Sequence, residues 1–94
     1  MRLRVTRLAQ WDVDQIHDQI AVDKTSAAHR WVERTQKQFK FLAKNPGVGE
    51  ARDEIRPAIR SFSHGNYVIY FRVTADALEI IRVVHGRRDV DSLF

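Results

Sequence analysis

Hydrophobic and polar positions alternate at the start of the chain. Leu3 and Val5 are apolar, whereas Arg2 and Arg4 between and before them are charged. Side chains of a strand point alternately to its two faces, so this pattern predicts a short strand with one solvated face over Met1–Thr6. The unpaired edge of such a strand could accept a partner strand.

From Leu8 the apolar positions recur every three or four residues, which is the spacing of one helix face. The recurring positions are Ala9, Val13, Ile16 and Ile20, followed by Ala28, Val32, Thr35, Phe39 and Leu42. Thr25 or Ser26 can cap the second helix, and Asn45-Pro46-Gly47 ends it. Two amphipathic helices joined by a short turn predict an antiparallel hairpin.

The C-terminal half returns to strand patterns. Strands are predicted over Ala58–Ser63, Tyr67–Val73 and Leu78–His85, after a surface loop over Gly47–Pro57. His64-Gly65-Asn66 has the composition of a hairpin turn, in which glycine can adopt positive φ. The predicted order is β-α-α-β-β-β, an α+β fold in which a helical hairpin packs on a mainly antiparallel sheet.

Composition narrows the class of protein. The 94 residues suffice for one domain, expected over 1–94, and 44% hydrophobic residues suffice for one core. The chain has no cysteine, which excludes disulfides and thiol chemistry. No stretch reads as a signal peptide or a membrane span, so a cytoplasmic location is expected.

Charge and histidine spacing limit the chemistry. The net charge of +4 permits binding to nucleic acid or to an acidic protein. His17 and His29 fall on different predicted helices, without a carboxylate at ligand spacing, so no metal site is expected. The sequence contains no phosphate-binding glycine loop and no nucleophile elbow, and it predicts no cofactor.

The last predicted strand ends in the densest group of polar side chains in the chain. Leu78–Asp89 reads LEIIRVVHGRRD, a buried strand followed by an imidazole, two cations and a carboxylate. A buried strand holds groups at its end in place, so we predict that this end, with the tail Val90–Phe94, forms the functional surface. Gly86 should turn the chain and direct Arg87 and Arg88 outward.

Arginines inside the predicted strands allow two interpretations. Strict alternation places Arg60 beside Phe62, and Arg82 beside Leu78, Ile80 and Val84. In the first interpretation their stems pack along the sheet and their charges are solvated or paired. In the second, Arg60 and Arg82 converge with His85 on the uncovered sheet face. Such a group could hold an RNA backbone and perform acid–base cleavage.

Four stretches in this order resemble the RelE/ParE superfamily of bacterial toxins, and ParE most closely. They are LAKNPGVG at 42–49, IRPAIRS at 55–61, HGNYVIYFR at 64–72 and IIRVVHGRRD at 80–89. The resemblance spans nearly the whole chain and implies the toxin of a type II toxin–antitoxin pair. ParE-like toxins poison DNA gyrase and are neutralised by a ParD-like antitoxin in a hetero-oligomeric complex.

The resemblance also implies an alternative. RelE-like relatives cleave mRNA on the ribosome, and here Arg60 and Arg82 could serve as the basic residues, with His85 as the acid–base group. The chain departs from that pattern because its tail has no tyrosine and the loop before Arg60 has no lysine. A third possibility is an inactive scaffold that only binds its antitoxin.

Two sets of site residues follow from this resemblance and the strand-end argument. The predicted target-binding residues are Arg82, His85, Arg87, Arg88, Asp89, Leu93 and Phe94. Asp89 could pair with a neighbouring arginine, and Leu93 and Phe94 either fold back on the core or contact the target. The predicted antitoxin-binding residues are Arg2, Arg4, Trp11, Trp31 and Phe41. Direct DNA binding is not expected except through the antitoxin.

Overall fold

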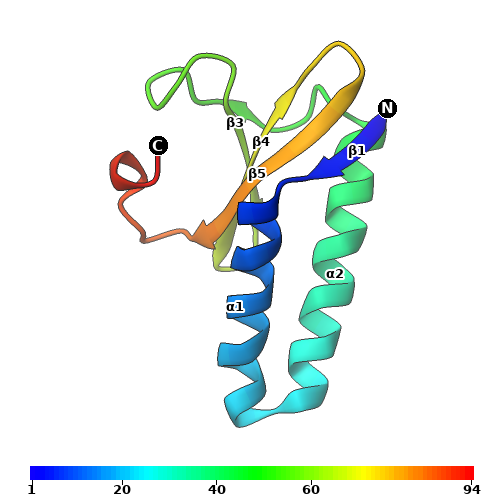
Figure 1. Cartoon of the computed structure of the whole chain (residues 1–94), viewed down its shortest axis with the longest axis vertical. Coiled ribbons are helices and arrows are strands. Elements are labelled where there is room, and N and C mark those ends of the chain that lie inside the picture. Colours follow the sequence, from blue (N-terminus) through cyan, green and yellow to red (C-terminus); the bar gives the residue numbers. More distant parts are fainter.

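The computed structural model describes all 94 residues, and Figure 1 shows two helices packed on one side of a twisted sheet. The elements are β1 (Arg2–Val5), α1 (Arg7–Asp23), α2 (Thr25–Lys44), β2 (Glu50–Ala51), β3 (Arg60–His64), β4 (Tyr67–Val73), β5 (Ala77–His85) and the 3₁₀ turn η1 (Val90–Ser92). The predicted strands and helices are confirmed, but β3 begins at Arg60 and not at Ala58, and it includes His64. β2, inside the predicted surface loop, and η1 are short additions. None of the helices has the length and apolar character needed to cross a bilayer.

The helical hairpin turns within one residue. Thr6 caps α1, because its hydroxyl accepts a hydrogen bond from the Ala9 backbone N–H at 3.1 Å. Lys24 alone separates α1 from α2, and this short connection places the helices antiparallel, side by side. The prediction that Thr25 or Ser26 caps α2 is wrong. Thr25 is already helical, and Lys24 occupies the cap position without a side-chain bond.

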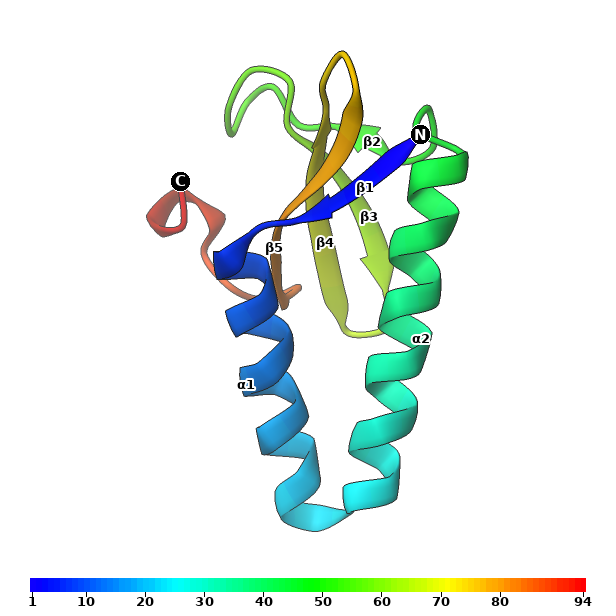
Figure 2. The same ribbon diagram turned by 45° about the vertical axis from the view of Figure 1, so that its right-hand side comes forward.

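Five strands form one mixed sheet in the order β1-β5-β4-β3-β2. β1 pairs parallel with β5, and the other neighbours are antiparallel, which confirms the α+β class. Figure 2 shows β1 lying alongside β5, and α2 contacts both of these strands. β5 therefore lies between two strands, β1 and β4, along its first residues.

An extra residue in β5 changes which side chains face the helices. Tyr70 lies opposite Arg82 and Phe71 lies opposite Ile80, so Ile81 has no partner on β4 and forms a β-bulge. The residues of β5 in the core under the helices are Leu78, Ile80 and Val83. The prediction that Arg82 shares a face with Ile80 is wrong, because the bulge moves Arg82 to the face of Tyr70.

The second face of the sheet carries a smaller core that the C-terminal tail covers. Its buried residues are Ile59, Tyr70 and Val84, against which Val90, Leu93 and Phe94 pack. The Phe94 ring meets Tyr70 edge-on at 5.6 Å between centroids, and Arg56 donates to the Phe94 carbonyl at 2.8 Å. Figure 1 shows the tail curled beside the loop that precedes β3. Leu93 and Phe94 thus fold back on the sheet.

Candidate functional site

The burial of β5 stops at its last residue. Val84 is buried, whereas His85 and residues 86–89 are exposed. The Gly86 backbone N–H donates to the Asn66 carbonyl at 2.9 Å, and the Arg88 N–H donates to the His85 carbonyl at 3.0 Å. These bonds fix the turn after the strand. The side chains of Arg87 and Arg88 form no ion pair within the chain.

His85 is held from two sides although it is exposed. Its ring meets Tyr67 edge-on, with 5.6 Å between centroids, and its Nδ1 accepts the Arg87 backbone N–H at 3.1 Å. Because Nδ1 is an acceptor, the neutral ring carries its proton on Nε2. Tyr67 also meets Trp31 edge-on at 5.3 Å. The three rings form a continuous aromatic row from α2 to the strand end.

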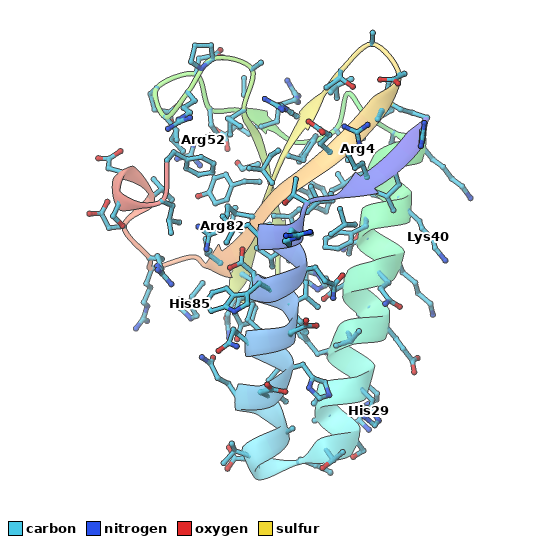
Figure 3. The ribbon with its side chains drawn as sticks, in the orientation of Figure 1. Arg4, His29, Lys40, Arg52, Arg82 and His85 are labelled. Carbon is cyan, nitrogen blue, oxygen red and sulfur yellow. The ribbon has the colours of Figure 1, made fainter.

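Arg82 lies on β5 just before this end, close to α1 (Figure 3), and it is buried and paired. Its Nε and Nη2 donate to the Asp12 carboxylate at 2.7 and 2.8 Å, and the Val83 N–H donates to the same carboxylate at 2.9 Å. The side chains of Arg82 and Asp12 are 8% and 5% exposed. Hydrogen bonding to Asp12 raises the pKa of Arg82 above its usual value. A two-point bond of this kind fixes α1 to β5.

The structure does not bring Arg60, Arg82 and His85 together, so the predicted convergence is wrong. Arg60 lies opposite Phe71, at one end of the β3–β4 pairing, whereas His85 lies opposite Tyr67 at the other end. The Arg60 guanidinium donates to the carbonyls of Gly47 and Gly49 at 3.2 and 3.0 Å. Arg82 is on the opposite sheet face and bound to α1.

The predicted target-binding set is therefore divided. His85, Arg87, Arg88 and Asp89 are exposed, whereas Arg82 is buried and the two tail residues are partly buried. Asp89 does not pair with an arginine. Its carboxylate accepts the Asp91 N–H at 3.1 Å and caps η1.

A small depression lies beside α1 at the end of β5. It is lined by Trp11, Asp12, Gln15, Ile16, Gln19, Tyr67, Val83, Val84, His85 and Arg88, and its volume is about 220 Å³. Trp11 is 54% exposed. We call this depression the α1 pocket. It joins an exposed aromatic side chain to the cationic strand end.

A larger groove of about 790 Å³ runs along α2 on the other side of Tyr67. It is lined by Ile20, Trp31, Arg34, Lys37, Gln38, Phe41, His64, Gly65, Asn66 and Tyr67, and we call it the α2 groove. Its charged residues, Arg34 and Lys37, are both basic and exposed. Trp31 is 6% exposed and belongs to the main core, whereas Phe41 is 42% exposed.

The predicted antitoxin residues fall in three places. Phe41 and the buried Trp31 line the α2 groove, and Trp11 lines the α1 pocket. Arg2 and Arg4 lie on β1, whose outer edge has no partner strand. Arg4 donates to Glu79 at 2.8 Å, and Arg72 donates to the same carboxylate at 2.6 Å. The bonds from Arg72 and then Arg4 lower the pKa of Glu79.

His64 is a site residue that sequence analysis missed, having been read only as part of a turn. Its Nε2 donates to the Thr35 hydroxyl at 2.9 Å, and that hydroxyl donates to the Trp31 carbonyl at 2.8 Å. Burial, and then the charge of Arg34, lower the pKa of His64. The imidazole therefore lines the α2 groove in its neutral form.

Asp12 and Tyr67 were also missed as site residues. Asp12 stands among the polar positions of α1, and its only sequence signal is its place beside the apolar stripe.

His17 and His29 stack at 5.5 Å between ring centroids, but no group of three or more histidine, aspartate and glutamate side chains lies close enough to hold a metal ion.

The fold is that of a toxin from a toxin–antitoxin pair. A solved structure titled "Chromosomal ParDE TA system from P. aeruginosa" matches with a TM-score of 0.80 at 28% identity, over 90% of this chain and 95% of that chain. The family model described as ParE toxin of type II toxin-antitoxin system, parDE, matches residues 3–90. The chain belongs to the ParE toxin family.

Curated relatives agree with this assignment. The chain is 37% identical to Toxin ParE1 of Mycobacterium tuberculosis over 82 residues, which is 86% of this chain and 79% of the relative. It is 31% identical to Toxin ParE1 of Caulobacter vibrioides over 90 residues, or 87% of this chain and 85% of that one. The protein is a type II toxin of the ParE family.

Proposed function

We propose that this ParE-family toxin poisons DNA gyrase through the strand end after β5. The observation that supports this assignment is the contrast between its cations. Arg87 and Arg88 are exposed without an internal partner, whereas Arg60 and Arg82 are bonded within the protein. Unpaired cations held at the end of a buried strand can bind another macromolecule, and such binding requires no acid–base group.

We propose that a ParD-like antitoxin neutralises the toxin by binding in the α2 groove. The groove combines exposed apolar surface from Phe41 with the cations Arg34 and Lys37. An amphipathic segment with acidic residues on one face fits such a groove. The product would be a hetero-oligomer in the cytoplasm, where gyrase acts.

The test compares gyrase inhibition by the parent with that by Arg87→Glu combined with Arg88→Glu. The double variant should lose inhibition of supercoiling, accumulation of cleaved DNA and growth arrest, while it still binds the antitoxin. The matched control is Lys24→Glu with Arg30→Glu, the same charge change at two exposed positions, one between the helices and one on α2. Full toxicity of the strand-end variant would disprove the assignment of this surface.

A ribosome-dependent ribonuclease is the second candidate, because His85 is exposed and its Nε2 is free beside two cations. Replacing a general acid or base slows a reaction by on the order of a hundredfold or more. Under the gyrase proposal His85→Ala should keep growth arrest nearly unchanged. Loss of arrest in a folded His85→Ala variant, with codon-positioned cuts by the parent, would favour the ribonuclease. A parent that arrests no cells would indicate a scaffold.

A further inference from the structure

We infer that Trp11 belongs to the target-binding surface and not to the antitoxin-binding surface. We further infer that the α1 pocket receives an acidic segment of the target protein, with an apolar side chain seated on the Trp11 ring. This inference rests on the proposed function, and it adds an aromatic anchor and the chemistry of the partner.

The position of Trp11 separates it from the other aromatic candidates. Trp11 shares the α1 pocket with His85 and Arg88, whereas Trp31 and Phe41 line the α2 groove. Tyr67 lines both and stands between them. An antitoxin segment in the α2 groove would therefore leave the exposed Trp11 ring free to meet the target.

The charge of the α1 pocket defines what it can accept. Asp12 is the only carboxylate that lines it, and Arg82 already neutralises that carboxylate. Arg88 thus remains as an unmatched cation, and Arg87 follows the same turn. An acidic side chain of the partner would complete the charge balance.

The remaining groups suit a polypeptide segment. Gln15 and Gln19 present side-chain amides in the α1 pocket, and amides can both donate to and accept from a partner's backbone. Tryptophan and arginine are the residues most enriched among those that dominate protein interfaces. An exposed Trp11 ring beside Arg88 therefore matches the centre of a protein interface.

The test measures gyrase inhibition and antitoxin binding by Trp11→Ala in the full chain. We expect the concentration for half-inhibition of supercoiling to rise by about thirtyfold, the loss typical of an aromatic anchor. Binding to the antitoxin encoded beside the toxin should remain at the parent level. Trp11→Phe should restore most of the inhibition, because it keeps an aromatic ring.

The matched control is Val22→Ala. Val22 is 85% exposed and lies about three turns further along α1, outside both the α1 pocket and the α2 groove. The Val22→Ala variant should inhibit gyrase as the parent does. Equal melting temperatures for Trp11→Ala, Val22→Ala and the parent would confirm that folding is intact.

Three outcomes would overturn the inference. The first is a folded Trp11→Ala variant that inhibits gyrase as well as the parent, which leaves the gyrase proposal standing. The second is loss of antitoxin binding by Trp11→Ala, which would place Trp11 on the antitoxin-binding surface. The third is binding of a labelled single-stranded oligonucleotide by the parent that Trp11→Ala loses, which would make the occupant a nucleic acid.

Failure of the gyrase proposal can be distinguished from these outcomes. If the parent leaves gyrase active, growth arrest replaces supercoiling as the measurement, since arrest requires no knowledge of the target. Trp11→Ala must then lose arrest and keep antitoxin binding. If it keeps arrest, the inference is wrong as well.

Discussion

Arg82 and Arg88 lie close together in the sequence but in opposite surroundings. Arg82 is buried in a two-point bond to Asp12, whereas Arg88 is exposed and has no ionic partner. The difference arises because α1 covers the edge of β5 at Arg82, and the chain turns away after Gly86. A basic residue in a motif therefore has a structural or a binding role according to the partner that the fold provides.

The largest effect on stability is expected when the carboxylate that pairs with the buried Arg82 is removed. Asp12→Ala leaves Arg82 buried without its carboxylate and the Val83 N–H without an acceptor. We expect the free energy of unfolding to fall by about 3–5 kcal/mol, as for other buried ion pairs that lose one member. Urea denaturation measures this loss.

The control for that variant is Asp14→Ala. Asp14 is exposed and bonds only to Gln10 on the same helix, so its removal should change stability by less than about 0.5 kcal/mol. A comparable loss in both variants would show that helix charge, and not the buried pair, explains the effect.

The next prediction compares the two tryptophans. Trp31→Ala removes a core side chain that contacts His64 and Tyr67, and should cost about 3 kcal/mol of stability. Trp11→Ala should cost less than about 0.5 kcal/mol, because the ring is exposed. Urea denaturation of both variants provides the measurement. Equal losses would contradict the burial difference on which the two surfaces are distinguished.

A smaller effect is expected from pH. The pKa of His64 is lowered in the folded state, so the unfolded chain binds more protons once the pH falls below about 6.5. The free energy of unfolding should therefore decrease as the pH falls through that value. His64→Gln should flatten this dependence when both proteins are denatured at several pH values. If His64→Gln shows the same pH dependence of stability as the parent, a group other than His64 is responsible for it.

The smallest effect concerns ionic strength. If an acidic antitoxin segment enters the α2 groove, its association rate should fall by about fivefold between low and high salt. Arg34→Ala with Lys37→Ala should weaken this salt dependence, whereas Arg87→Ala with Arg88→Ala should preserve it. Stopped-flow mixing measures both. Equal responses of the two variants would mean that net charge alone steers association.

The helices and strands were predictable because their apolar spacing is regular. The stripe from Ala9 to Ile20 and the hairpin at Gly65 required only local rules. The Asp12–Arg82 bond was not predictable in this way, since its members are far apart in sequence and Asp12 resembles any polar helix residue. The separation of Trp11 from Trp31 likewise depends on how α1 and α2 pack around Tyr67.

The bulge at Ile81 accommodates one extra residue in β5 without changing how the strand end faces β4. Valine or leucine at this position would retain the extra residue and the present arrangement. Deleting the residue would remove the bulge and leave Ile80 opposite Phe71 and Arg82 opposite Tyr70, since neighbours along a regular strand already point to opposite faces. His85 would still lie opposite Tyr67. A homologous chain with the same His-Gly-Arg-Arg motif, but one residue fewer before it, would therefore present that motif on the same side of the sheet from a regular strand.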